Sequence, residues 1–291
     1  MTVAQRFETF LENIKITSEQ SKDGETKHGG VRACLNKYYY NSTSETVNSL
    51  LVGSWGKHTR IRPPRDIDVM FVLPYSVYQR LETRPGNKQS QLLQEVKSVL
   101  AKTYTTTTMR ADGQVVVVPF VSYAVEVVPA FKLDNGKYWI CDTNGGGKYK
   151  TTDPDAEASA LSTSDTNTVG KTRHLIRMMK KWQSYGTVPL KSFCIELLAA
   201  DFLASWQYRD KTMVYYDYMI RDFLKYLIGK ANGYVFVPGT SEFVLLSDGW
   251  KSRAESADAR AVKACEYEAG NYPTLAGEEW QKIFGTYIPI S

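Results

Sequence analysis

The feature that most constrains this chain is a pair of aspartates one residue apart, at the start of the apolar run Asp66-Ile67-Asp68-Val69-Met70-Phe71-Val72-Leu73. The run is rich in β-branched and aromatic residues, which favour a strand. Because alternate residues of a strand share a face, Asp66 and Asp68 should point to one side while Ile67 and Val69 point into a core. Two carboxylates held side by side repel each other unless a cation lies between them. The pattern therefore predicts a divalent-cation site.

An Asp-x-Asp pair taken alone is more often a turn or a solvated strand edge. A second pair, Gly53-Ser54, precedes it by about a dozen residues. Glycine lets the backbone approach a ligand closely, and serine adds a hydroxyl beside exposed N–H groups, a combination that suits a phosphate. The two pairs together indicate a site for a metal-bound phosphate.

This combination resembles the signature of the polymerase β-like nucleotidyltransferase superfamily. Its longer form resembles the bacterial relatives of cyclic GMP-AMP synthase and oligoadenylate synthase, the cGAS/DncV-like nucleotidyltransferases (CD-NTases) of CBASS anti-phage defence. The residues that carry this longer resemblance are Gly53-Ser54-x-x-Lys57-x-Thr59-x-Ile61 followed by Asp66-Ile67-Asp68. The resemblance implies synthesis of a cyclic di- or trinucleotide from NTPs with release of pyrophosphate.

The family requires a third carboxylate on a neighbouring strand, and Glu126 in Val125-Glu126-Val127-Val128 is the candidate. A glutamate inside so apolar a run is costly unless it is paired or bound to a metal. The resemblance assigns Asp66, Asp68 and Glu126 to two Mg²⁺ ions. All-oxygen ligation suits Mg²⁺ or Mn²⁺ and disfavours zinc.

The resemblance also implies groups that hold the NTP. It gives the β and γ phosphates to Gly53 and Ser54, and the donor phosphates to Lys180 and Ser192. A serine at the start of a helix can bind an anion through its hydroxyl and the free backbone amides. The alternative interpretation, which we weigh equally, is that Ser192 only caps its helix and that the basic residues form a solvated helix face. The uncertain helix phase also leaves Lys181 and Lys191 as substitutes for Lys180.

Composition narrows the class of protein. The 291 residues carry a net charge of +5, which favours anionic ligands such as nucleotides but is too small to indicate a dedicated DNA surface. No apolar run approaches the roughly 20 residues that span a bilayer. Four scattered cysteines without a C-x-x-C pair favour free thiols in a reducing cytoplasm. The expected partners are ATP, GTP or pyrimidine NTPs and CBASS accessory or effector proteins, with no membrane and no dedicated double-stranded DNA site.

The expected fold class is α+β, a polymerase β-like core of mixed sheet and flanking helices followed by a C-terminal helical lobe. We expect the core lobe with the N-terminal helices over 1–165, the helical lobe over 166–291, and the active site in the cleft between them. Within the core, the patterns predict helices over 3–20 and 25–41 with a turn over 18–24, strands over 46–52, 105–109, 114–118 and 119–128, and a polar connector over 159–168.

Two other functions remain open at this point. One is nucleotidyl transfer to a different acceptor, an antibiotic or a protein side chain; such enzymes are usually shorter and lack a long helical lobe. The other is a nucleotide-binding module without chemistry, which the intact set of carboxylates disfavours. The bases used, the 3′–5′ or 2′–5′ linkage and the ring size depend on pocket side chains that the sequence does not place.

Overall fold

A computed structural model describes residues 1–291, apart from the side chain of Asp112. The chain divides into two compact units. The sheet unit comprises 16–58 and 64–156, and the helical unit comprises 1–15, 59–63 and 157–291. Each unit therefore draws on more than one stretch of sequence, and the short segment 59–63 belongs to the helical unit although both its neighbours belong to the sheet unit.

The sheet unit is built on a seven-stranded mixed sheet with the order β1-β2-β5-β4-β3, in which β6 pairs with β5 and β7 pairs with β6. Only β2 and β5 run parallel; the other pairs are antiparallel. The strands are β1 (Ser49–Leu51), β2 (Asp66–Val72), β3 (Arg110–Asp112), β4 (Val115–Pro119), β5 (Ala124–Lys132), β6 (Tyr138–Asp142) and β7 (Lys148–Thr152).

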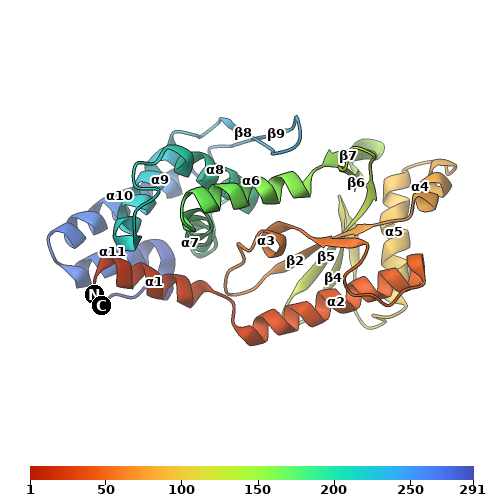
Figure 1. Cartoon of the computed structure of the whole chain (residues 1–291), viewed down its shortest axis with the longest axis horizontal. Helices are drawn as coiled ribbons and strands as arrows, with labels where there is room; N and C mark the ends of the chain where they lie inside the picture. The colour runs from red at the N-terminus through yellow and green to blue at the C-terminus, as the bar shows by residue number, and fades with distance from the viewer. The chain divides into compact units, whose positions relative to one another are not determined.

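Helices cover one face of this sheet (Figure 1). They are α2 (Ser18–Tyr40), α4 (Tyr75–Glu82) and α5 (Lys88–Ala101), while α3 (Gly53–Gly56) is a single turn between β1 and β2. The covered face carries the apolar residues of the central strands, among them Ile67 and Val69 of β2 and Val125 and Val127 of β5, all fully buried. The alternation of these strands leaves their polar residues on the other face.

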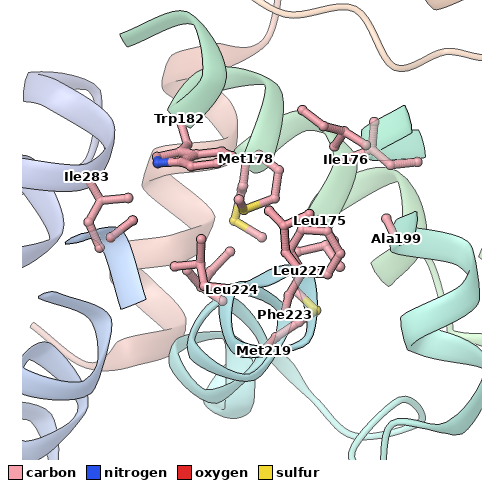
Figure 2. Close-up of a cluster of buried hydrophobic side chains, with 14 of the residues drawn as sticks. Leu175, Ile176, Met178, Trp182, Ala199, Met219, Phe223, Leu224, Leu227 and Ile283 are labelled. Atoms are coloured by element: carbon pink, nitrogen blue, oxygen red, sulfur yellow. The ribbon is translucent and has the colours of Figure 1, made fainter. Parts of the chain in front are cut away.

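The helical unit contains α1 (Val3–Ile14), α7 (Lys171–Tyr185), α8 (Ser192–Ser205), α9 (Tyr216–Ile228), α10 (Lys251–Ala269), α11 (Pro273–Phe284) and the hairpin β8 (Tyr234–Phe236) with β9 (Phe243–Leu245). Figure 2 shows its core, where Leu175, Met178 and Trp182 of α7 meet side chains of the neighbouring helices. The chain termini lie close together in this unit (Figure 1). Short 3-10 turns occupy Met213–Tyr215 and Gly285–Tyr287 in this unit and Asn144–Gly146 in the sheet unit.

The observed division differs from the expected lobes at two points. The first helix packs in the helical unit rather than with the core lobe, because Phe7, Phe10 and Ile14 are fully buried in the helical core. The boundary falls at residue 156 rather than 165. The expectation that the active site lies in the cleft between the two lobes stays a prediction.

Three local expectations were wrong. The turn over 18–24 is part of α2, which begins after Thr17 in a capping box with Gln20. The connector over 159–168 is α6 (Pro154–Asn167), which has proline at its first position and Asp153 accepting from the Ala156 amide. The strand over 105–109 begins only at Arg110. Within the described residues no helix is both long and apolar enough to span a bilayer.

Candidate functional site

The three predicted carboxylates lie on neighbouring strands and on one face of the sheet. In the parallel pair of β2 with β5, Asp68 is opposite Glu126 and Asp66 is opposite Ala124. Residues opposite each other in a ladder project to the same side, so Asp66, Asp68 and Glu126 share the face that α2 and α5 leave uncovered. Asp66 is exposed, and Asp68 and Glu126 are half-buried. We call these three residues the acid row.

Gly53 lies directly against the acid row. Its φ of +56° is left-handed, and a Cβ placed on it would lie 1.9 Å from Oδ2 of Asp68. The Val52 amide donates to the Asp68 carbonyl at 3.0 Å, which ties the entry of α3 to β2. Only glycine satisfies both the backbone conformation and the close approach of the carboxylate. The predicted Gly-Ser pair and the Asp-x-Asp pair are thus in contact.

Trp55 holds the α3 turn in place. Its ring is buried and packs edge-on against His28 of α2, at 5.7 Å between centroids, and against Tyr123, at 5.9 Å. Gly24 of α2 lies so close that a Cβ there would be 2.5 Å from Cη2 of Trp55. The indole therefore anchors the turn that carries Gly53 and Ser54. This role was not predicted, because Gly24 was expected in a turn; the tryptophan directly after Gly-Ser was the available signal.

The electrostatics of Glu126 reflect its surroundings. Burial raises the pKa of its carboxyl, the nearby Asp66 charge raises the pKa further, and Arg110 lowers it. Arg110 belongs to the same row of the sheet, because it is opposite Val117 and Val117 is opposite Glu126. A carboxyl with a raised pKa beside a like charge is the situation that a bound cation relieves.

The donor chemistry of the acid row fits a hard divalent cation such as Mg²⁺, because every ligand it offers is a carboxylate oxygen. Among the described side chains, no three His, Cys, Asp or Glu residues are gathered closely enough to form a finished metal cage. The backbone register brings the carboxylates to adjacent positions, and binding a cation would require their side chains to converge.

Lys180 has partners that the sequence analysis did not anticipate. Its side chain is buried, and its Nζ donates to Oε1 of Glu196 at 2.6 Å and to Oγ1 of Thr59 at 2.8 Å. The ammonium is thus engaged inside the helical unit, and its assignment to donor phosphates stays a prediction. The next lysine, Lys181, is buried with its Nζ 3.1 Å from the ring centre of Tyr287.

Ser192 is the first residue of α8, but it does not cap the helix through its side chain. Its Oγ donates to Oε1 of Gln183 on α7 at 2.9 Å. The hydroxyl oxygen keeps its acceptor capacity, so the contact leaves its phosphate role as a prediction. Neither Gln183 nor Glu196 could be recognised as a partner from the sequence, because both pairings join residues on different helices.

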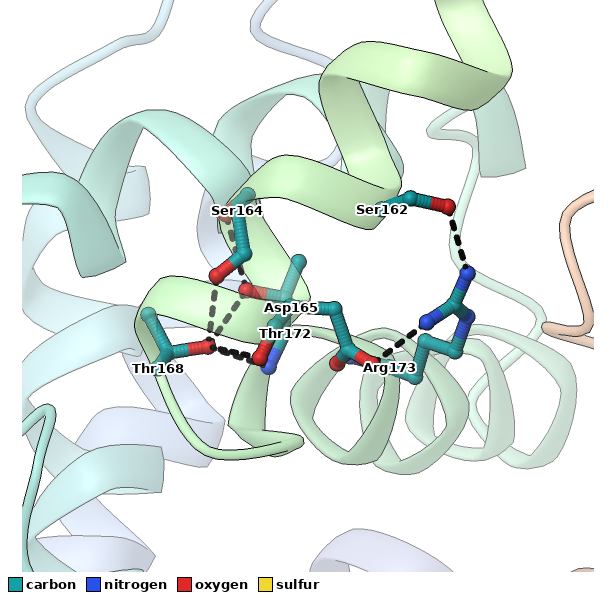
Figure 3. A network of polar contacts seen from close by, with 6 residues as sticks. All are labelled: Ser162, Ser164, Asp165, Thr168, Thr172 and Arg173. Carbon is teal, nitrogen blue, oxygen red and sulfur yellow. Dashed lines mark hydrogen bonds and ion pairs between the residues drawn. The ribbon is translucent and has the colours of Figure 1, made fainter.

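The N-terminus of α7 is fixed by the polar network in Figure 3. Asp165 accepts from the backbone amide of Arg173 at 2.8 Å and pairs with its guanidinium. The hydroxyl of Thr172 lies 2.8 Å from that of Ser164 and 2.9 Å from that of Thr168. These contacts join the end of α6 to the start of α7, the helix that bears Lys180.

Comparison with known proteins decides the family. The model of the Second Messenger Oligonucleotide or Dinucleotide Synthetase domain matches residues 1–165, more than half of the chain. The chain belongs to this family. The predicted family and the predicted class of reaction, synthesis of an oligonucleotide second messenger by nucleotidyl transfer, are thereby confirmed.

Relatives of this synthetase share its fold at low sequence identity. A probable cyclic nucleotide synthase of Bacillus cereus is 22% identical, with 81% of each chain covered. CdnC from Escherichia coli MS115-1, solved with ATP, is 17% identical with a TM-score of 0.69, covering 98% of both chains. DncV from Vibrio cholerae in its GTP-bound form is 13% identical with a TM-score of 0.72, covering 99% of this chain and 96% of that one. The predicted fold class is confirmed.

Proposed function

We propose that this synthetase joins NTPs into a cyclic di- or trinucleotide with release of pyrophosphate, as a signal in bacterial anti-phage defence. The observation that carries the proposal is the acid row, in which Asp68 and Glu126 are opposite each other on parallel strands with Gly53 against Asp68. The family match supports the product class. The acid row supports transfer chemistry, because carboxylates on adjacent strands are the ligands that a metal-bound triphosphate needs.

Each residue of the site has an assigned role. Asp66 and Asp68 would hold the metal that binds the triphosphate, and Glu126 would complete the donor set on the acceptor side. Bound Mg²⁺ or Mn²⁺ supplies charge stabilisation at the transferring phosphoryl group and the leaving pyrophosphate. Gly53 and Ser54 would hold the β and γ phosphates, at a turn that Trp55 keeps rigid. A preorganised site of this kind lowers the barrier by positioning.

We assign Lys180 and Ser192 to the donor phosphates on the family resemblance. For Lys180 the assignment requires that its ammonium be shared between Glu196 and the nucleotide, since the ion pair of 2.6 Å already neutralises it. For Ser192 it requires only that the hydroxyl oxygen and the first amides of α8 face the nucleotide. Of the two residues, Ser192 would have to change its present contacts less than Lys180 in order to bind the nucleotide.

The partners follow from the proposed chemistry. The substrates are ATP, GTP or pyrimidine NTPs, which places the reaction in the cytoplasm. Among proteins of similar fold, CdnC has been solved with ATP and in complex with a HORMA protein, and DncV has been solved with GTP. On the basis of these structures, we propose for this chain only that its substrates are NTPs and that it acts with an accessory or effector protein of the CBASS type.

The test incubates the protein with all four labelled NTPs and Mg²⁺, measures pyrophosphate release, and identifies the products by mass spectrometry. The wild-type chain should form a cyclic product from NTPs alone, whereas transfer to an antibiotic or protein would need a second acceptor. Asp66→Ala with Asp68→Ala should abolish the product and leave the fold intact. The matched control is Asp134→Ala, which removes an exposed carboxylate from a turn and should keep full activity. Undiminished turnover in the double variant would rule out the proposal.

A further inference from the structure

The segment 59–63 departs from the path of the chain around it. It joins the turn that carries Gly53 and Ser54 to the strand that begins at Asp66, yet it belongs to the helical unit. The chain leaves the sheet unit after His58 and re-enters it at Pro64. We call the segment 59–63 the strap. The strap is thus the covalent link between the turn that carries Gly53 and Ser54 and the strand that begins at Asp66.

The first end of the strap is held by a buried polar triad. Thr59 is fully buried; its Oγ1 donates to Oε1 of Glu196 at 2.9 Å and accepts from Nζ of Lys180 at 2.8 Å. Lys180 also donates to the same Glu196 oxygen at 2.6 Å. A hydroxyl is the one small group that can donate to the carboxylate and accept from the ammonium at the same time.

The other end of the strap is held by α1. The Arg62 amide donates to the Ile14 carbonyl at 2.6 Å, and its Nε donates to the Asn13 carbonyl at 2.9 Å. Ile61, between the two anchors, packs against the core of the helical unit. The strap is thus tied at both ends to helices of the helical unit.

A buried ion pair seldom adds net stability, because desolvation of both charges offsets their attraction. Its geometry is nevertheless strict, since each partner has few ways to satisfy its hydrogen bonds in a dry interior. The triad of Thr59, Lys180 and Glu196 therefore defines a position more than it stabilises a fold. The position it defines is that of the strap.

We infer that Thr59 is a positioning residue, whose hydroxyl, held between Lys180 and Glu196, sets the strap and through it the path of the loop that joins Gly53-Ser54 to Asp66. This inference rests on the proposed function. Thr59 itself would contact neither the phosphates nor the metal. Loss of its hydroxyl should weaken turnover by displacing groups that do.

Thr59→Val tests the inference, since valine keeps the shape of threonine and replaces its hydroxyl with a methyl group. We expect kcat/KM for pyrophosphate release to fall about tenfold or more, because small displacements of catalytic groups are costly. Thr59→Ser restores the hydroxyl and should stay within about threefold of wild type. In a Glu196→Gln background the Thr59→Val effect should shrink, because members of one network are not additive.

The matched control is Thr172→Val, also in the helical unit. Thr172 is fully buried, and its hydroxyl meets two others in the network of Figure 3. Both valine variants should lower the Tm, but Thr172→Val should keep wild-type kcat/KM when assayed well below its Tm. A merely structural role for Thr59 would make the two variants alike, and equal turnover in Thr59→Val and wild type would overturn the inference. A wild-type protein that makes no product from NTPs would instead overturn the proposed function, and the inference with it.

Discussion

At the scale of single residues, Gly53 is the position with least freedom. It combines a left-handed backbone with a carboxylate oxygen where its Cβ would be. Gly136 has only the first of these constraints: its φ is +84°, and nothing lies within 4 Å of a Cβ placed on it. The chain therefore offers an internal comparison between the cost of backbone strain and the cost of disturbing the acid row.

Gly53→Ala and Gly136→Ala should each lose about 1 kcal/mol of folding free energy from the left-handed backbone. Only Gly53→Ala should also lose nearly all NTP turnover, because its methyl group would displace the Asp68 carboxylate. Denaturant unfolding and pyrophosphate release measure the two effects separately. If Gly136→Ala lost activity equally, the close approach to Asp68 would not be the cause.

At the scale of elements, α2 supports the active-site turn. Its Gly24 admits the Trp55 ring, and its His28 packs edge-on against the same ring. Because the contact is tight, a substitution on either side of it should affect the other side. A change in α2 should reach the turn through Trp55, and a smaller ring at position 55 should relax the demand for glycine at position 24.

Gly24→Ala should destabilise the protein by about 1–2 kcal/mol, because overpacking against a held ring outweighs the roughly 1 kcal/mol that alanine gains in a helix. In a Trp55→Phe background the same substitution should cost nothing or stabilise, since phenylalanine lacks the indole atoms that the new methyl group would strike. Thermal unfolding of the four proteins of this double-mutant cycle measures the coupling. Additive effects would contradict the packing described for α2.

One source of pH-dependent stability lies in α2. Burial, with help from the Arg32 charge, lowers the pKa of His28 to about 4, and neither ring nitrogen has a hydrogen-bond partner among the described residues. Below pH 6.5 the unfolded chain protonates this histidine while the folded chain does not. The contribution of His28 to stability is therefore present above pH 6.5 and is lost as the pH falls toward 4.

His28→Phe should remove that loss. Between pH 6.5 and 4 the wild-type protein should lose about 2–3 kcal/mol more than the variant, at 1.36 kcal/mol for each unit of pKa shift. Urea unfolding at a series of pH values measures the difference. Parallel stability profiles for the two proteins would contradict the assignment.

At the scale of the whole molecule, the first helix and the last residues of the chain are joined to each other in the helical unit. Arg6 of α1 is fully buried; it pairs with Glu268 at 2.9 Å and donates to the carbonyls of Pro273, Pro289 and Ile290. One guanidinium therefore binds α10, the start of α11 and the final residues to the first helix. This contact explains why α1 belongs to the helical unit although, apart from the strap, the rest of the N-terminal half belongs to the sheet unit.

Arg6→Met should cost about 3–5 kcal/mol, because it leaves Glu268 buried without its partner and several carbonyls without a donor. The control is Lys15→Met, which breaks the pair with Glu12 at 3.4 Å, where both side chains are about two thirds exposed. That variant should change the free energy of unfolding by less than about 0.5 kcal/mol. Similar losses in the two variants would show that Arg6 does not hold the chain ends together.

The sequence was sufficient where the argument depended on local periodicity. The alternation from Asp66 to Val72 placed both aspartates on one face, and the apolar surroundings of Glu126 marked it as unusual. It was insufficient where distant segments meet. Nothing in the sequence set Asp68 opposite Glu126, or brought Thr59 to Lys180 and Glu196, because pairing of strands and packing of helices depend on tertiary structure. The start of α2 is a different case. It was predicted wrongly although the local signal, the capping box Thr17-x-x-Gln20, was present in the sequence.

The parallel register of β2 with β5 decides where this protein can accept changes of length. Deletion of one residue inside Ala124–Lys132 would turn Glu126 toward the buried face and carry Val125 or Val127 out among the aspartates. An insertion between Asp134 and Gly136, or in the glycine turn at 144–147, would lie outside every strand and shift no partner. Natural variation in length should therefore gather in those turns, and they are the places to graft a tag or a reporter.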